Sequence, residues 1–364
     1  MNTEQKLLPA LLTCFVCACL FCTPVWAGDN AEFFLLFNID GLHYTNESNN
    51  LNLDENDLDA GVDLFYVYHQ KNNRLLVEYF AGTEESELER LQYDYQLNDY
   101  ATIKIGRMYT PLGYWSTRFH HGIYFQTSAS RPQIVKNEDA GGILPIHITG
   151  VTLAGSTNSR SNGWQYNLML GIAPNLSVNG SGNIELSPFD LLNPHKGAQN
   201  NPAAVFKLHY ITNDKLQTDS GISIQVQKTD AHEIGLFYIK QNIINFYSHL
   251  DFIGKRIIAS GFYVKSRLSN PSGDEIRGNF VNAYLQYEQD IFTHWTAYGR
   301  VENAWRENND PYLALFPGFI NRQVVTGLRY DFTKSQAVNL EYSDARKVSN
   351  KFSSLTLQWS AIFP

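Results

Sequence analysis

The sequence predicts an all-β fold, a transmembrane antiparallel β-barrel of about 16 strands with a long inserted constriction loop. Three observations predict it. Apolar and polar residues alternate with a period of two through most of the chain. Beyond the N-terminal segment, no apolar run reaches the length of a transmembrane helix. The last strand is apolar at every second residue up to Phe363. A soluble β-sandwich would share the alternation, so the connections and the chain end decide between the two folds.

Residues 1–27 are expected to be a secretory signal peptide. Lys6 gives a weakly positive start, residues 7–21 an apolar core, and residues 25–27 a small-residue cleavage site. Residues 28–364 then form the barrel. Residues 16–19 faintly resemble a lipid-attachment box, but the apolar region continues past them.

Composition excludes several classes of protein. All four cysteines lie within residues 1–27, so the mature chain is expected to carry no disulfide and no thiol chemistry. The formal net charge is −8, which excludes a nucleic-acid-binding protein. Diffusion through a lined opening needs no cofactor, and none is expected.

The connections favour a membrane barrel over a sandwich. Short polar turns alternate with long irregular connections, which is the asymmetry between the periplasmic and external ends of an outer-membrane barrel. Aromatic residues recur near strand ends, as interfacial girdles require. The pattern contains seventeen strand-like segments, among them residues 232–240 and 243–250. An even count is required and the phases disagree between Ser220 and Leu250, so one false strand is expected there.

The longest connection, residues 109–146, is expected to fold back into the lumen and narrow it. It follows the fifth strand and is rich in aromatic residues, whereas disordered segments lack such packing material. In the strand before it, alternation after Ile103 and Ile105 directs Arg107 toward lipid, unless Gly106 interrupts the strand or Arg107 lies at the rim.

A family resemblance rests on GRMYTPLGYW at residues 106–115, on its RP and GGILP continuation, and on the last strand. That strand resembles the C-terminal assembly signal of bacterial outer-membrane proteins, although Pro364 follows the aromatic Phe363. The chain resembles the bacterial outer-membrane porin superfamily and is similar to its phosphate-selective porin-like branch. The resemblance implies a channel in the bacterial outer membrane for passive diffusion of small hydrophilic or ionic solutes. It also implies an eyelet formed after the fifth strand, a homotrimer, and contact with membrane lipid and lipopolysaccharide.

Charged residues of the inserted loop are predicted to form the pore constriction, because fixed charges around a narrow passage select permeants by sign and size. These residues are Arg118, His120, His121, Arg131, Lys136, Glu138 and Asp139. Alternation predicts a second, inward-facing set on the pore wall, namely Lys265, Arg267, Arg300, Glu302 and Arg329. The alternative for each is that it pairs with another charge only to tolerate burial. Ion preference stays open, because the resemblance suggests a preference for anions, whereas the negative net charge suggests a preference for cations.

Other classes of function remain open. The chain could be a non-conducting barrel that serves as an anchor or adhesin, or, with less support, a barrel hydrolase. Enzyme motifs such as a nucleophile elbow are absent from the sequence, so no catalytic residue is predicted. No metal site is predicted either, because neighbouring residues on a strand point to opposite faces and His120-His121 has no further ligand at a suitable spacing.

Overall fold

The computed structural model describes residues 30–47, 56–83, 86–119, 123–136, 142–158, 162–178, 182–187, 201–214, 216–307, 310–347 and 350–364. The predicted signal peptide, residues 1–27, lies outside these described residues. No described helix is long and apolar enough to cross a membrane.

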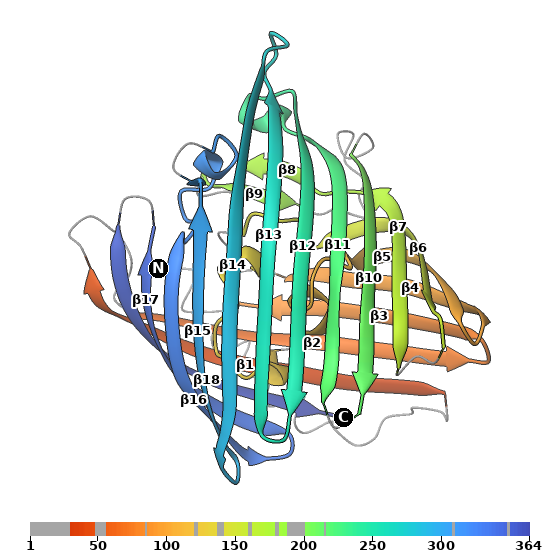
Figure 1. Ribbon diagram of the computed structural model, residues 1–364, viewed down its shortest axis with the longest axis vertical. Helices are drawn as coiled ribbons and strands as arrows, with labels where there is room; N and C mark the ends of the chain where they lie inside the picture. The colour runs from red at the N-terminus through yellow and green to blue at the C-terminus, as the bar shows by residue number, and fades with distance from the viewer. Residues whose placement is uncertain are drawn as a thin grey trace, which may run out of the picture.

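Sixteen antiparallel strands form one closed barrel, which confirms the predicted fold and strand number. Each strand pairs with its neighbours in chain order, and β1 pairs with β18 from Leu35 opposite Phe363 to Glu47 opposite Phe352. Figure 1 shows β10–β14 upright at the front and β1–β4 crossing behind them at a steep angle. The barrel strands are β1 (Ala31–Glu47), β2 (Asn56–Gln70), β3 (Asn73–Gly82), β4 (Ser86–Asn98), β5 (Ala101–Tyr109), β6 (His147–Ser156), β7 (Gly163–Ile172), β10 (Pro202–Asn213), β11 (Gln217–Asp230), β12 (Tyr238–Phe252), β13 (Lys255–Ser269), β14 (Glu275–Phe292), β15 (Trp295–Trp305), β16 (Arg322–Thr333), β17 (Gln336–Arg346) and β18 (Lys351–Phe363).

The false strand lies where the phases of the alternation disagree. The two segments expected at residues 232–240 and 243–250 are one turn followed by one strand, the 3₁₀ turn η4 (His232–Ile234) and then β12. Gly235 ends the turn with a φ of 78°. A left-handed residue cannot continue a strand, so pairing restarts at Tyr238. A further hairpin, β8 (Asn175–Val178) with β9 (Ile184–Ser187), lies in the connection between β7 and β10, where only an irregular loop was expected.

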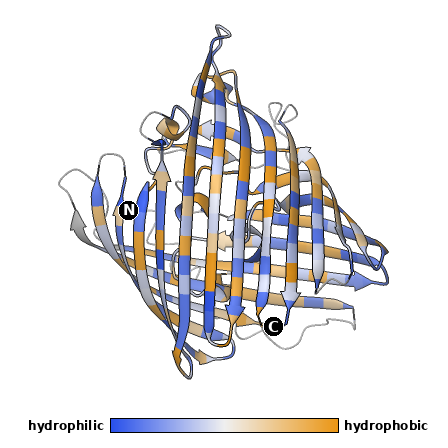
Figure 2. Cartoon of the chain, in the orientation of Figure 1, coloured by the Kyte–Doolittle hydropathy of each residue, from blue (hydrophilic) through white to orange (hydrophobic). Residues whose placement is uncertain are grey.

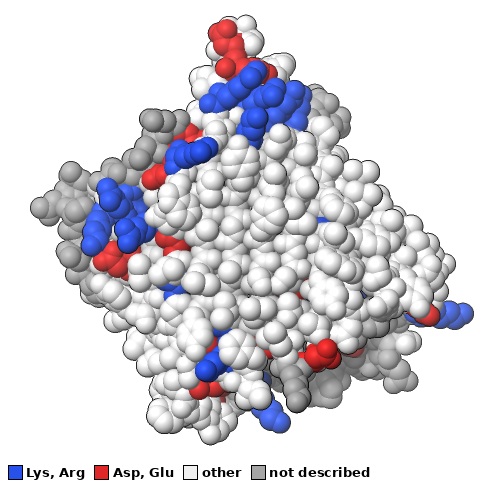
Figure 3. Space-filling view, in the orientation of Figure 1, with Lys and Arg blue, Asp and Glu red and all other residues white. Residues whose placement is uncertain are grey.

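Side chains alternate between the outer and inner faces of the barrel wall. Phe246 and Leu285 are exposed on the outside, whereas their sequence neighbours are buried toward the lumen. Figure 2 shows this alternation as orange and blue bands along each strand. Figure 3 shows a middle belt of the outer surface almost free of Lys, Arg, Asp and Glu, with charges gathered toward the two ends. An uncharged belt between charged margins is the surface that a bilayer covers.

The described residues of the connection between β5 and β6 lie inside the barrel. The connection contains the short helix α2 (Trp115–Arg118) and the 3₁₀ turns η1 (Ile123–Phe125) and η2 (Gln133–Val135). Figure 1 shows these yellow elements enclosed by the upright strands. Because this segment is connected to the wall on several sides, it divides the lumen rather than capping one end.

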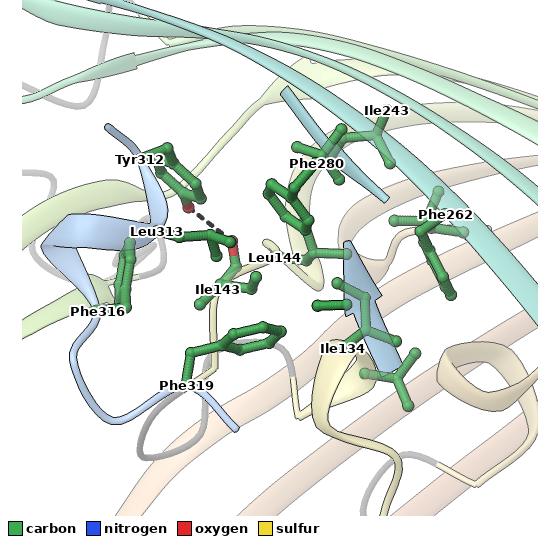
Figure 4. Packing of buried hydrophobic residues seen from close by; sticks show 14 of the residues in the cluster. Ile134, Ile143, Leu144, Ile243, Phe262, Phe280, Tyr312, Leu313, Phe316 and Phe319 are labelled. Atoms are coloured by element: carbon green, nitrogen blue, oxygen red, sulfur yellow. Dashed lines mark hydrogen bonds between the residues drawn. The ribbon is translucent and has the colours of Figure 1, made fainter. Parts of the chain in front are cut away.

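An apolar cluster fills the lumen between the inserted loop and one side of the wall. Ile134, Ile143 and Leu144 of the loop pack with Phe262 of β13 and Phe280 of β14. Figure 4 shows these side chains facing one another. The external loop after β15, with the 3₁₀ turn η6 (Leu313–Leu315), adds the apolar residues Tyr312, Leu313, Phe316 and Phe319 to the cluster.

The last residues of β5 leave strict alternation. Gly106 has a φ of 128°, and a Cβ there would run into the carbonyl of Leu91. Pairing of β5 with both neighbours nevertheless continues through Gly106 without a register shift. Arg107 does not face lipid freely: its side chain is 6% exposed and its Nη2 lies 3.2 Å from Oε2 of Glu87. Glycine is required at this position because of its positive φ and the nearby Leu91 carbonyl.

Candidate functional site

The first turn of the inserted loop is fixed to the wall by β10 and β11. The Gly113 amide donates to Oγ of Ser223 at 3.2 Å, and this hydroxyl donates to the Pro111 carbonyl at 3.1 Å. Lys207 Nζ donates to the Gly113 carbonyl at 2.7 Å. Gly113 has a φ of 74°, a conformation that favours glycine. Buried polar groups of the wall therefore hold the backbone of the loop where it enters the lumen.

A second anchor is formed by Arg300 and Glu302 of β15. The Arg300 guanidinium donates to the Ser130 carbonyl at 2.9 Å and to Ser130 Oγ at 2.7 Å, and it lies 3.3 Å from Oε1 of Glu302. Glu302 Oε2 accepts the Gln133 amide at 2.7 Å. Both charges are almost fully buried, and the loop backbone supplies much of their hydrogen bonding.

A third anchor joins the loop to the last strands. Glu341 of β17 accepts the amides of Ala129 at 3.0 Å and Ser130 at 3.2 Å. Arg329 of β16 donates to the Gln126 carbonyl at 2.6 Å. The loop backbone thus reaches the wall at β10, β11 and β15–β17, and its position does not depend on any single contact.

A polar cavity, called the passage below, lies on the opposite side of the lumen from the apolar cluster. A cavity of about 350 Å³ lies between the loop and the inner faces of β4–β7, β10 and β11. Four basic side chains and one carboxylate line it, along with neutral polar groups such as Gln92 and Asn167. The basic residues are Arg90, Lys104, Arg118 and Lys207, and the acid is Asp219.

The acidic member of the passage is surrounded by partners. Asp219 Oδ1 lies 2.8 Å from Nδ1 of His209 and accepts the Tyr247 hydroxyl at 2.9 Å, while its Oδ2 lies 3.6 Å from Nη2 of Arg118. The Arg118 side chain is 53% exposed and extends from the loop into the passage. Lys207 lies 4.7 Å from the Tyr247 ring centroid. The negative charge of Asp219 is therefore compensated, and positive charge prevails along the passage.

Positive charge on the far wall of the passage is partly compensated too. Arg90 pairs with Glu78, and its guanidinium lies 4.5 Å from the ring centroid of Tyr109. Tyr109 donates its hydroxyl to Glu78 at 3.0 Å. This ordered trio places a cation at the surface of the passage with its counter-charge behind it.

The predicted constriction residues fall into three groups. Arg118 lines the passage. Arg131 and Lys136 lie on the wall side of the loop, where they interact electrostatically with Asp40 and Glu302. His120, His121, Glu138 and Asp139 lie outside the described residues.

The predicted wall residues also divide. Arg300, Glu302 and Arg329 face inward, where they bind the backbone of the inserted loop and not the open passage. Lys265 and Arg267 do not face the lumen, so their assignment to the pore wall is corrected. On β13 the inner face carries apolar residues such as Phe262 and Val264, because the inserted loop covers it. The two basic residues consequently occupy the outer face, near the external end of the strand.

Lys104, Lys207 and His209 are among the passage residues that escaped the sequence analysis although a signal existed. Ile103 and Ile105 predict lipid-facing positions, and strict alternation then turns Lys104 inward. In β10, Phe206 points outward, so alternation turns Lys207 inward. His209 lies two residues further on the same inner face. Alternation shows which residues of each strand point inward. It does not show which of these inward residues the inserted loop leaves uncovered.

One cluster has the composition of a metal site. Glu87, Glu89 and His147 each bring a ligand atom within 4.8 Å of the others. His147 Nε2 lies 2.9 Å from Oε2 of Glu89, and Arg107 pairs with Glu87. Arg107 thus supplies a counter-charge for Glu87, and His147 is the neighbour of Glu89.

Comparison with known proteins identifies the fold only. No family model matches the chain, and no curated protein matches its sequence. Three solved structures illustrate the similarity. OmpF of Salmonella typhi, solved with daunomycin, has a TM-score of 0.59 at 9% identity and covers 93% of this chain and 99% of its own. The outer-membrane channel DcaP of Acinetobacter baumannii has a TM-score of 0.56 at 10% identity, and the match covers 92% of this chain and 97% of DcaP. An anion-selective porin from Comamonas acidovorans has a TM-score of 0.55 at 10% identity, and the match covers 92% of this chain and 99% of that porin. The fold is that of bacterial outer-membrane porins.

Proposed function

We propose that the chain is an outer-membrane channel for passive diffusion of small hydrophilic or ionic solutes, and that it passes anions in preference to cations. The observation that carries the proposal is the passage beside the inserted loop, with four basic side chains and a single compensated carboxylate. Fixed positive charge in a narrow, low-dielectric passage raises the local concentration of anions and repels cations. The resemblance of residues 106–115 to the phosphate-selective porin-like branch, which is part of the same proposal, agrees with this sign and extends the proposal to phosphorylated or carboxylated solutes.

The inserted loop acts as the constriction in this proposal. It occupies one side of the lumen through the apolar cluster and leaves the polar side open. The anchors at Lys207, Arg300 and Glu341 hold its backbone against the wall, so the aperture stays narrow without a moving part. A homotrimer belongs to the same proposal, and light scattering of the detergent-purified protein tests it.

Bilayer conductance tests the channel and its ion preference. In a KCl gradient, the zero-current potential of the wild type should show chloride to be the preferred ion. The double variant Lys104→Glu, Arg118→Glu should shift that potential toward potassium, since both side chains line the passage. Lys265→Glu is a matched control, because Lys265 lies on the outer face of β13 and should leave the potential unchanged.

The outcomes separate the proposal from its competitor. The same apolar cluster would suit a barrel closed to ions, which anchors or adheres. Folded, inserted protein that gives no conductance steps would favour that function. Conductance whose ion preference ignores the double variant but follows Lys265→Glu would reject this passage as the ion path.

A further inference from the structure

Four basic residues form a row across four neighbouring strands on the outside of the barrel. The register places Arg277 opposite Arg267, Arg267 opposite Lys240, and Lys240 opposite Lys228, so they stand at one height on β14, β13, β12 and β11. Lys265 lies two residues from Arg267 on the same face of β13. Like charges on directly opposed residues destabilise a sheet. A row of this kind therefore requires counter-charge.

Among the described residues, counter-charge reaches only the arginine end of the row. Glu275 Oε2 lies 3.0 Å from Nη2 of Arg277 and 3.9 Å from Nη1 of Arg267. One carboxylate thus serves two guanidinium groups, and both pairs are exposed at the surface.

The lysine end has aromatic contacts instead. The ammonium groups of Lys228 and Lys240 lie 5.0 Å and 4.9 Å from the ring centroid of Tyr238. In the described part of the chain, no carboxylate lies within salt-bridge distance of Lys228, Lys240 or Lys265. Three neighbouring ammonium groups are consequently left for an external anion.

These lysines stand over a hollow with an apolar floor. A cavity of about 680 Å³ on the outer face is lined by Lys228, Lys240, Lys265 and Arg267, and also by apolar residues of β7, β10 and β11. The apolar residues are Leu170, Pro202, Ala204 and Val226. The small side chains of Pro202 and Ala204, next to Gly171, leave the space that larger residues would fill. A ligand for this hollow would carry both anionic and hydrocarbon parts.

The hollow lies at the external margin of the uncharged belt. On the outer face of β13, the next lysine toward the other end is Lys255, 265 − 255 = 10 residues away. At about 3.4 Å per residue this is about 34 Å along the strand. For a strand tilted by about 40° it spans about 25 Å, the height of the apolar band of an outer-membrane barrel. Figure 3 shows basic side chains gathered directly above the belt, at the end that carries the long connections.

We propose that this hollow binds a phosphorylated, multiply acylated glycolipid of the outer leaflet, the chemistry of the lipid A part of lipopolysaccharide. The sugar phosphates bind Lys228, Lys240 and Lys265, and the acyl chains lie along Leu170, Val226 and the belt below them. The inference rests on the proposed outer-membrane location, but not on conductance or ion preference.

Binding of purified lipid A to the detergent-solubilised barrel tests the inference. Native mass spectrometry should detect one retained lipid A per wild-type chain. The triple variant Lys228→Gln, Lys240→Gln, Lys265→Gln should bind on the order of a hundredfold more weakly, because each basic residue at a charged lipid surface contributes about fivefold. The matched control removes three lysines from the other end of the barrel, Lys71→Gln, Lys255→Gln, Lys334→Gln, and should bind like the wild type.

Further binding measurements identify which part of the ligand is recognised and show whether a loss of binding comes from misfolding. Dephosphorylated lipid A should lose most of its affinity, and inorganic phosphate alone should not compete at equal concentration, because both parts of the ligand are needed. Lys228→Arg, Lys240→Arg, Lys265→Arg should restore binding. Equal binding by the wild type and the glutamine triple variant, or by phosphorylated and dephosphorylated lipid, would overturn the inference. Bilayer conductance is measured in parallel: a conducting wild type that retains no lipid A rejects the lipid site alone, whereas absence of conductance steps rejects the proposed channel.

Discussion

Lys207 of the barrel wall donates a 2.7 Å hydrogen bond from Nζ to the carbonyl of Gly113 in the inserted loop. The same ammonium lies 4.7 Å from the Tyr247 ring centroid and lines the passage. One side chain therefore both positions the constriction and contributes to its charge. Buried ammonium groups are retained only where hydrogen bonds and aromatic faces replace lost water.

Lys207→Met should weaken anion preference severalfold. Methionine keeps the length and apolar contacts of lysine but removes a charge whose effect on a passing ion is on the order of 1 kcal/mol. The zero-current potential in a KCl gradient measures the change, and Lys207→Arg should preserve the preference. An unaltered potential in the methionine variant would show that ions do not pass this lysine.

Arg300→Met should destabilise the barrel by about 3–5 kcal/mol, because Glu302 would keep a buried charge without its partner. Urea unfolding followed by tryptophan fluorescence measures the loss. The double variant Arg300→Met, Glu302→Gln should recover part of it, since the uncompensated charge is gone. If the single and double variants were equally destabilised, the pair would not be coupled as the 3.3 Å contact indicates.

Gly106→Ala should destabilise the barrel by at least about 1 kcal/mol and reduce the yield of folded protein. Both its φ of 128° and the nearby Leu91 carbonyl exclude a Cβ. Gly261→Ala is the matched control, because a Cβ there meets nothing within 4 Å. Folding yield and urea midpoints should separate the two variants. Similar behaviour of both would mean that the backbone at Gly106 adapts.

Acidification should stabilise the external loop at Asp310. Desolvation by burial raises the pKa of Asp310 above its ordinary value of 3.8, although the amides of Tyr312 and Leu313 donate to it at 3.0 Å. With the folded pKa raised, the folded state holds the proton more tightly, so stability is highest below 3.8 and falls as pH rises through the folded pKa. Asp310→Asn removes this dependence. As pH falls, the urea midpoint of the wild type should therefore rise relative to that of the variant. If the two midpoints changed equally with pH, the assignment would be contradicted.

Periodicity predicted the fold because each strand of a barrel must present one apolar face to lipid. It could not locate the end of the turn at Gly235, where a left-handed residue delays the start of β12. The hairpin of β8 and β9 was missed for a similar reason: each strand has only four residues, too few to establish a period.

The candidate site was predictable only in part. The length and aromatic content of residues 109–146 indicated a segment within the lumen, and Arg118 does line the passage. The side on which the loop packs depends on contacts such as Ile134 with Phe262, between residues far apart in the chain. Those contacts make the inner face of β13 apolar and turn Lys265 outward, against the expectation that charged residues face the lumen. Alternation defines the two faces of a strand, but only tertiary packing determines which face contacts water.

The seam between β1 and β18 has a consequence for biogenesis. Leu35 meets Phe363, so the first strand of the barrel finds its partner only in the last strand of the barrel. Until then both outermost strands expose unpaired amides and carbonyls, which invite association with other chains. The polypeptide must therefore be kept apart from its neighbours until the ring closes, and a truncation that removes β18 would leave an open sheet instead of a ring.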